Sequence, residues 1–240
     1  MSEHYKQSRN EPCEQIYRWP TSRSKSWTAT FLNLARKDEN IMAVVAVGSS
    51  VRSSVRSSDL DLVMICREPA RMKTKPPIEI DIRTYAASGV DTLIRGGNDL
   101  LGWAVKFGRV LFQRERFWDS VLENWLDRLP FPSADVALQR AGDSFRRLSN
   151  VLKLGDVDAA YEQALSYVTH IARAELLRRQ VYPASRPELP KQLRTAGCVR
   201  IAEWLERLID RTVEHSEQIT ELVDSYNLTS DYRNSLAERC

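Results

Sequence analysis

Three aspartates stand in short apolar stretches, where carboxylates on neighbouring strands could bind a cation. Asp59 and Asp61 alternate with leucines, and Asp81 lies between two isoleucines. A strand has a period of two, so Asp59 and Asp61 would share one face while the leucines occupy the other. Three carboxylates on adjacent strands would repel one another strongly without a cation between them. An all-oxygen cluster of this kind predicts a site for Mg²⁺ or Mn²⁺.

A Gly-Ser pair precedes the aspartates and follows an apolar run. Residues 41–47 contain no polar side chain, which is typical of a strand buried on both faces. Gly48 can take backbone angles closed to other residues, so the chain can turn tightly there with its amides exposed. Ser49 adds a hydroxyl, and the spacer 50–58 adds further serines and two arginines. This stretch is either a phosphate-binding turn or a solvated loop.

In this order and spacing, the residues resemble the nucleotidyltransferase superfamily to which DNA polymerase β belongs. That family combines an apolar strand ending in Gly-Ser or Gly-Gly, a spacer, an Asp-x-Asp pair and a later lone Asp. The short spacer is similar to that of the minimal branch, which includes aminoglycoside nucleotidyltransferases and small MNT-type proteins. Many of those relatives carry Arg-Gly in the spacer, whereas Ser53 follows Arg52 here. The matching residues are Gly48, Ser49, Asp59, Asp61 and Asp81.

The resemblance implies an enzyme that moves a nucleoside monophosphate from a nucleoside triphosphate, such as ATP, to an acceptor and releases pyrophosphate. The acceptor would be a hydroxyl of a small, aminoglycoside-like molecule or another nucleophile. The alternative is a nucleotide-binding regulatory or antitoxin-like module without turnover. The implied catalytic and metal-binding residues are Asp59, Asp61 and Asp81. The implied nucleotide-binding residues are Gly48, Ser49, Ser50 and Arg52.

The sequence around these residues predicts the elements that position them. Strands are expected at 41–47, 59–66, 78–85 and 109–113, with Ser26 capping a helix before the first strand. Short helices are expected between the third and fourth strands. The third strand should direct its isoleucines, Ile78 included, away from Asp81. The strands would form a small mixed sheet.

Proline residues at 130 and 132 predict a domain boundary, because proline breaks helices and restricts the residue before it. Beyond the boundary, apolar residues recur at helical spacing, which predicts a bundle of antiparallel helices. We therefore predict an α+β fold. A nucleotidyltransferase domain would span residues 1–130, and an all-α helical bundle would span 131–240. Residues 1–23 would form a loose arm, or Ile16, Tyr17, Trp19 and Pro20 would pack against the body. By resemblance, the bundle would form a wall of the acceptor site.

Composition restricts the class of partner. The chain of 240 residues carries a net charge of +3, which suits an anionic nucleotide but is not typical of a dedicated nucleic-acid binder. An RNA acceptor is therefore disfavoured. The four cysteines form no C-x-x-C pair, which favours a reduced, cytoplasmic setting without a zinc site. No apolar run approaches membrane-spanning length, so no membrane partner is expected. No feature indicates an oligomeric state.

Overall fold

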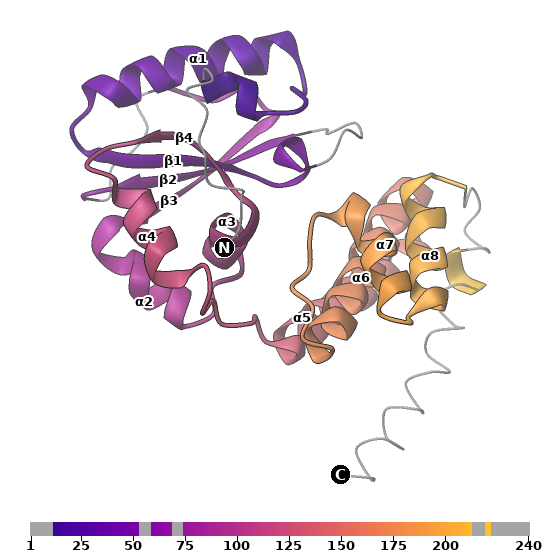
Figure 1. The fold of residues 1–240 in the computed structure, drawn as a ribbon. Helices are drawn as coiled ribbons and strands as arrows, with labels where there is room; N and C mark the ends of the chain where they lie inside the picture. The colour runs from indigo at the N-terminus through magenta and orange to yellow at the C-terminus, as the bar shows by residue number, and fades with distance from the viewer. Residues whose placement is uncertain (1–11, 53–58, 69–73, 213–218, 222–240) are drawn as a thin grey trace. The chain divides into compact units, whose positions relative to one another are not determined.

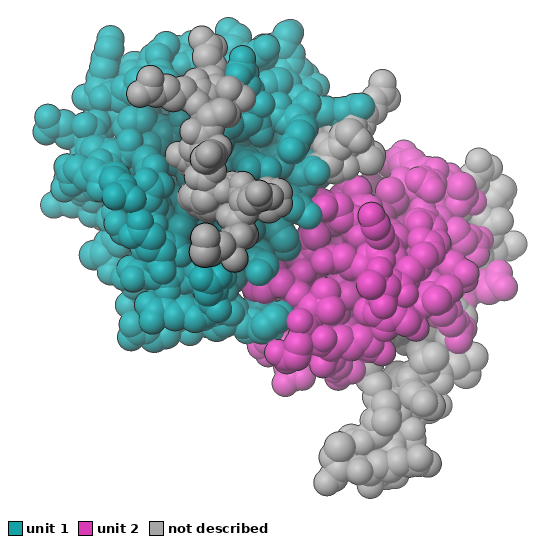
Figure 2. All heavy atoms as spheres, in the orientation of Figure 1, with its two compact units in different colours: residues 1–132 teal, residues 133–240 magenta. Residues whose placement is uncertain are grey.

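The chain divides into two compact units, residues 1–132 and 133–240, which Figure 2 colours separately. The computed structural model describes residues 12–52, 59–68, 74–212 and 219–221. The fold is α+β, as predicted, with a mixed sheet in the first unit and helices in the second. The predicted boundary at 130/131 lies close to this division. The activity assigned to each unit stays a prediction.

A four-stranded sheet with the order β3-β2-β1-β4 forms the centre of the first unit. The central strand β1 (Ile41–Val47) is antiparallel to β2 (Leu60–Cys66) and to β4 (Arg109–Gln113). The outer strand β3 (Ile80–Ala86) is parallel to β2. Every residue of β1 is buried, as its unbroken apolar run predicts. Because of these directions, β1 ends at the edge of the sheet where the other three strands begin.

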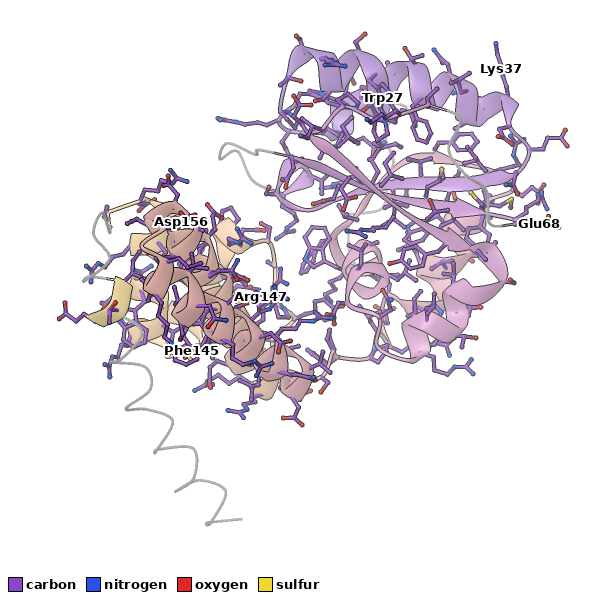
Figure 3. All side chains as sticks on the ribbon, turned by 180° about the vertical axis from the view of Figure 1, so that it is seen from behind. Trp27, Lys37, Glu68, Phe145, Arg147 and Asp156 are labelled. Atoms are coloured by element: carbon purple, nitrogen blue, oxygen red, sulfur yellow. The ribbon has the colours of Figure 1, made fainter. Side chains whose placement is uncertain are left out.

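Helices cover both faces of this sheet (Figure 1). Helix α1 (Ser22–Lys37) lies on one face, and α2 (Val90–Arg95), α3 (Asp99–Phe107) and α4 (Phe117–Trp125) lie on the other. Each face of the sheet has its own hydrophobic core, and the one beneath α1 is called the α1 core. Side chains of β2 alternate between the two, so Leu62 packs in the α1 core and Val63 packs in the core on the other face. Trp27 of α1, labelled in Figure 3, packs against the α1 core. Asp61 therefore belongs to the face that α2, α3 and α4 cover.

Residues 12–23 do not form a loose arm, one of the two arrangements that the sequence allowed. A 3₁₀ helix, η2 (Pro12–Gln15), is followed by Ile16, which is buried in the α1 core. The backbone N–H of Tyr17 donates a hydrogen bond to the carbonyl of Ser50 at 3.0 Å. These contacts fix the segment to the body of the unit, although it has no periodic pattern. Residues 1–11 lie outside the described residues.

Helix α1 begins earlier than predicted. Thr21 caps it, because its Oγ1 accepts a hydrogen bond from the N–H of Ser24 at 3.0 Å. The sequence offered Ser26 as the cap, and Ser26 lies inside the helix. A hydroxyl residue identifies a possible cap, but the stretch from Thr21 to Ser26 contains four such residues, and their side chains alone do not identify the cap.

The strands that carry the aspartates begin later than predicted. β2 begins at Leu60 and β3 at Ile80, so Asp59 lies just outside its strand. The N–H of Ile80 donates to the carbonyl of Pro77 at 3.0 Å and closes a turn over the two residues between them. Ile78 is consequently 99% exposed. The prediction that Ile78 faces away from Asp81 within the strand is wrong for this reason.

The second unit is helical. Its two long helices, α5 (Ala134–Leu154) and α6 (Val157–Arg178), pack closely along each other, and Figure 3 labels Phe145 and Arg147 on α5. Gly155 at φ 73° ends α5, and Asp156 caps α6 by accepting a hydrogen bond from the N–H of Ala159. The remaining elements are η5 (Arg186–Glu188), α7 (Leu189–Thr195) and α8 (Val199–Ile209). Within the described ranges, no helix has both the length and the apolar character needed to cross a membrane.

Candidate active site

Two of the predicted aspartates meet at the edge of the sheet where β1 ends. Asp61 on β2 and Asp81 on β3 are direct partners in the parallel pairing of these strands. On its other side, Asp61 is paired with Val47, the last residue of β1. Gly48 follows Val47, so the glycine turn and both carboxylates share one edge. The sheet topology therefore brings together residues from three separate parts of the sequence.

The Gly48 turn lies directly against the carboxylate of Asp61. Gly48 has φ 83° and ψ −164°, a conformation that is essentially restricted to glycine. A Cβ atom at this position would lie 2.7 Å from Oδ2 of Asp61. The chain then forms η3 (Ser49–Val51), and the N–H of Arg52 closes it by donating to the Ser49 carbonyl at 3.1 Å. Only glycine allows the backbone and this carboxylate to approach so closely.

The spacer between the turn and Asp59 is closed by a hydrogen bond. The hydroxyl of Ser50 donates to the backbone carbonyl of Asp59 at 2.7 Å, and Ser50 is buried. Its side chain therefore ties the two ends of the spacer together, while Ser49 is partly exposed and Arg52 is exposed. Residues 53–58, which include the second spacer arginine, Arg56, lie outside the described residues.

The carboxylate of Asp61 is in an unfavourable environment for a negative charge. Its pKa is raised from the ordinary 3.8 to about 6, first by burial and then by the negative charges of Asp59 and Asp81. The positive charge of Arg83 acts in the opposite direction but is the smallest of the four causes. The negative charges of Asp59 and Asp81 thus both act on Asp61.

Arg83 is a residue of this edge that the sequence prediction missed. Its Nε and Nη2 each lie 3.0 Å from Oδ2 of Asp81. The two side chains are 66% and 52% exposed, so solvent screens the pair, and its net contribution to stability is about 0–1 kcal/mol. The sequence could have predicted this contact, because residues 81 and 83 lie on the same face of a strand, which has a period of two.

Phe107 is a second missed residue. It is the last residue of α3, and the guanidinium carbon of Arg52 lies 4.5 Å from the centre of its ring. This distance is within the range of a cation–π contact. The sequence around Phe107 contains no sign of this contact, which depends on where α3 ends relative to the Gly48 turn.

The donor chemistry of the edge fits a hard divalent cation. All three predicted ligands offer carboxylate oxygens, which suit Mg²⁺ or Mn²⁺. The pKa of Asp61 is raised mainly by burial and further by the negative charges of Asp59 and Asp81, and a bound cation would offset both effects. Among the described residues, however, no group of three or more His, Cys, Asp and Glu side chains is gathered closely enough to hold a metal ion. The metal-ligand set of Asp59, Asp61 and Asp81 stays a prediction.

Comparisons with known proteins were made for the whole chain. No protein-family model matches the sequence, and no curated protein matches it. One similar solved structure is a nucleotidyltransferase-like protein from Exiguobacterium sibiricum 255-15, at 18% identity and a TM-score of 0.36. The match covers 82% of this chain and 73% of that one. At this identity and TM-score, the likeness is too weak to assign a family or a function.

Proposed function

We propose that this protein is a metal-dependent nucleotidyltransferase. It would move a nucleoside monophosphate from a nucleoside triphosphate to a hydroxyl of a small, aminoglycoside-like or other acceptor. The observation that carries the proposal is the meeting of the Gly48 turn with Asp61 and Asp81 at one edge of the sheet. The resemblance of the same residues to the DNA polymerase β superfamily supports it.

The residues at this edge would have two roles, which are to bind the triphosphate with its cation and to accept a proton from the acceptor. The backbone amides of Gly48 and Ser49, with the guanidinium of Arg52, would bind the terminal phosphates, because exposed amides and cations favour anions. Asp59, Asp61 and Asp81 would hold the divalent cation. When bound, this cation supplies positive charge that offsets the negative charge on the reacting triphosphate.

The acceptor reaction needs a base and a leaving group. The hydroxyl oxygen of the acceptor forms a bond to the α-phosphorus, and the bond from that phosphorus to its bridging oxygen breaks. The bridging oxygen leaves with pyrophosphate. Asp81 would accept the proton of the acceptor hydroxyl, since a carboxylate within hydrogen-bond reach can serve as a general base.

A second candidate function is a nucleotide-binding regulatory or antitoxin-like module without turnover. The ion pair between Arg83 and Asp81 favours it, because this pair occupies one oxygen of the proposed base. Such a protein would bind a triphosphate at the Gly48 turn but would release no pyrophosphate.

Asp81→Asn separates the two functions. Binding and transfer would be measured on the same preparation, using a triphosphate labelled at the α-phosphate with Mg²⁺ and a panel of hydroxyl acceptors. Loss of a general base costs about 10²- to 10⁴-fold in rate. We therefore expect transfer to fall at least about a hundredfold. Triphosphate binding should weaken far less, because Asp59, Asp61 and the Gly48 turn would hold most of the triphosphate, and asparagine retains the size of aspartate.

Glu79→Gln is the matched control. Glu79 is the nearest preceding carboxylate in the chain, and it lies in the turn before β3. Its transfer rate should remain near that of the wild type. Wild-type transfer by Asp81→Asn together with loss in Glu79→Gln would show that the base has been misassigned. Triphosphate binding by the wild type without transfer to any acceptor would favour the regulatory module.

A further inference from the structure

The cation–π contact between Arg52 and Phe107 involves the arginine that directly follows η3. Arg52 closes η3 through its own backbone, so its Cα position is tied to the turn. Its long side chain is exposed, and an exposed arginine normally samples many rotamers. The ring of Phe107, with its centre 4.5 Å from the guanidinium carbon, gives this side chain a defined place.

Phe107 is itself held firmly at this edge of the sheet. It precedes Gly108, where a Cβ atom would lie 2.7 Å from Cγ1 of Val45, so the end of α3 packs tightly against β1. Arg109 then pairs with Ala46 near the end of β1. The ring of Phe107 also contacts the ring of Trp103, with 5.1 Å between their centres. The support for Arg52 is therefore fixed by the packing of a helix on the central strand.

We propose that Phe107 is a positioning residue, which holds the Arg52 guanidinium ready for the terminal phosphates of the triphosphate. This inference rests on the proposed function. The guanidinium carbon is held over the ring by a cation–π contact, and the N–H donors of the guanidinium lie in its own plane, where an anion can accept from them. An anion at the Gly48 turn would thus meet an oriented guanidinium. Less side-chain entropy is lost on binding when the guanidinium is already oriented.

Phe107→Leu tests this role, because leucine keeps an apolar side chain but removes the aromatic face. The probe is inorganic tripolyphosphate with Mg²⁺, titrated calorimetrically against the full-length protein. An exposed cation–π contact is equivalent to about a two- to fivefold change in affinity, and we expect binding to weaken by that factor. Phe107→Tyr retains an aromatic face and should restore wild-type binding.

Phe112→Leu is the matched control. Phe112 also has an arginine near its ring, with the guanidinium carbon of Arg114 5.8 Å from the ring centre, but this arginine donates to backbone carbonyls near the opposite edge of the sheet. The substitution removes a phenyl ring from β4 of the same unit without touching the proposed phosphate site. Its tripolyphosphate affinity should equal that of the wild type.

A double-mutant cycle with Arg52→Gln decides whether Phe107 acts through Arg52. In the Arg52→Gln background, Phe107→Leu should have no further effect on affinity. Three results would overturn the positioning role and leave the proposed function standing. These are an equal loss of affinity from Phe107→Leu in both backgrounds, wild-type affinity of the Phe107→Leu variant, and weakened tripolyphosphate binding by Phe107→Tyr. If the wild type does not bind tripolyphosphate or a nucleoside triphosphate, the proposed function fails and this inference falls with it.

Discussion

At the scale of single residues, the charge of Asp61 should destabilise the protein when no metal is present. The folded-state pKa is raised from 3.8 to about 6, so folding favours the protonated form. The associated stability is fully present below pH 3.8 and is lost as the pH rises through 6. Each pKa unit corresponds to about 1.4 kcal/mol, so the ionised carboxylate costs at most about 3 kcal/mol.

Asp61→Asn should therefore be more stable than the wild type by about 1–3 kcal/mol at pH 8 in the presence of a chelator. Denaturant unfolding at several pH values measures this difference, which should shrink toward pH 4. Asp127→Asn removes an exposed carboxylate of the same unit and serves as the control. A difference for Asp61→Asn that does not change with pH would show that its charge is not the cause.

Local spacing is sufficient to predict some residues of the site and not others. The shared face of the aspartates and the turn at Gly48 could be predicted, because each depends on residues that are neighbours in the sequence. The Arg83 contact could have been found by the same period. The Phe107 contact could not, because it depends on the end of α3 packing against β1, which no local pattern encodes.

At the scale of elements, the turn between β1 and η3 depends on Gly48. Gly48→Ala places a side chain in a conformation that is essentially restricted to glycine and directs its Cβ at Oδ2 of Asp61, 2.7 Å away. We expect a loss of about 1–3 kcal/mol in the free energy of unfolding. Triphosphate binding should also weaken, since the turn must shift its amides. Thermal and denaturant unfolding measure the first effect, and calorimetric titration measures the second.

Gly89→Ala is the control for this substitution. Gly89 has φ −94°, and a Cβ atom there would meet nothing within 4 Å. Its stability and triphosphate affinity should stay near those of the wild type. In an Asp61→Ala background, Gly48→Ala should cost less stability than it does in the wild type but should still cost some, because the clash is absent while the backbone strain remains. Full stability of Gly48→Ala alone would contradict the close approach of turn and carboxylate.

The strands themselves were largely predictable, but their first residues were not. The apolar run of β1 is sufficient to predict a buried central strand. The start of β3 depends instead on its partner, because β2 begins at Leu60 and Leu60 pairs with Ile80. Before that point, Pro77 and Ile80 close a turn. The alternation of apolar and polar residues extends back to Ile78, although the pairing of β3 with β2 begins only at Ile80.

At the scale of the whole molecule, each unit has its own hydrophobic core. Two clusters lie on the two faces of the sheet in the first unit, and two further clusters lie among the helices of the second. Helical periodicity after the prolines is sufficient to predict this division. The apolar residues of segment 12–23 allowed both a loose arm and packing against the body. The sequence could not decide between the two, because the segment is held by contacts with distant residues rather than by a pattern of its own.

The residues proposed to bind the triphosphate all lie in the first unit, which leads to a prediction for its isolated fragment. A fragment of residues 1–132 contains both of that unit's cores, so it should show a cooperative thermal transition. We expect it to keep Mg²⁺-dependent triphosphate binding. It should lose transfer to any hydroxyl acceptor that the full chain uses, if the helical unit recognises the acceptor.

The measurement compares binding and transfer for the fragment, for residues 133–240, and for an equimolar mixture of the two. The helical fragment alone should bind no triphosphate, because it lacks the Gly48 turn and the three aspartates. Transfer at the full-chain rate by residues 1–132 would show that acceptor recognition belongs to the first unit. Triphosphate binding by residues 133–240 would contradict the placement of the nucleotide site itself, since no residue proposed to hold phosphate lies beyond Pro132.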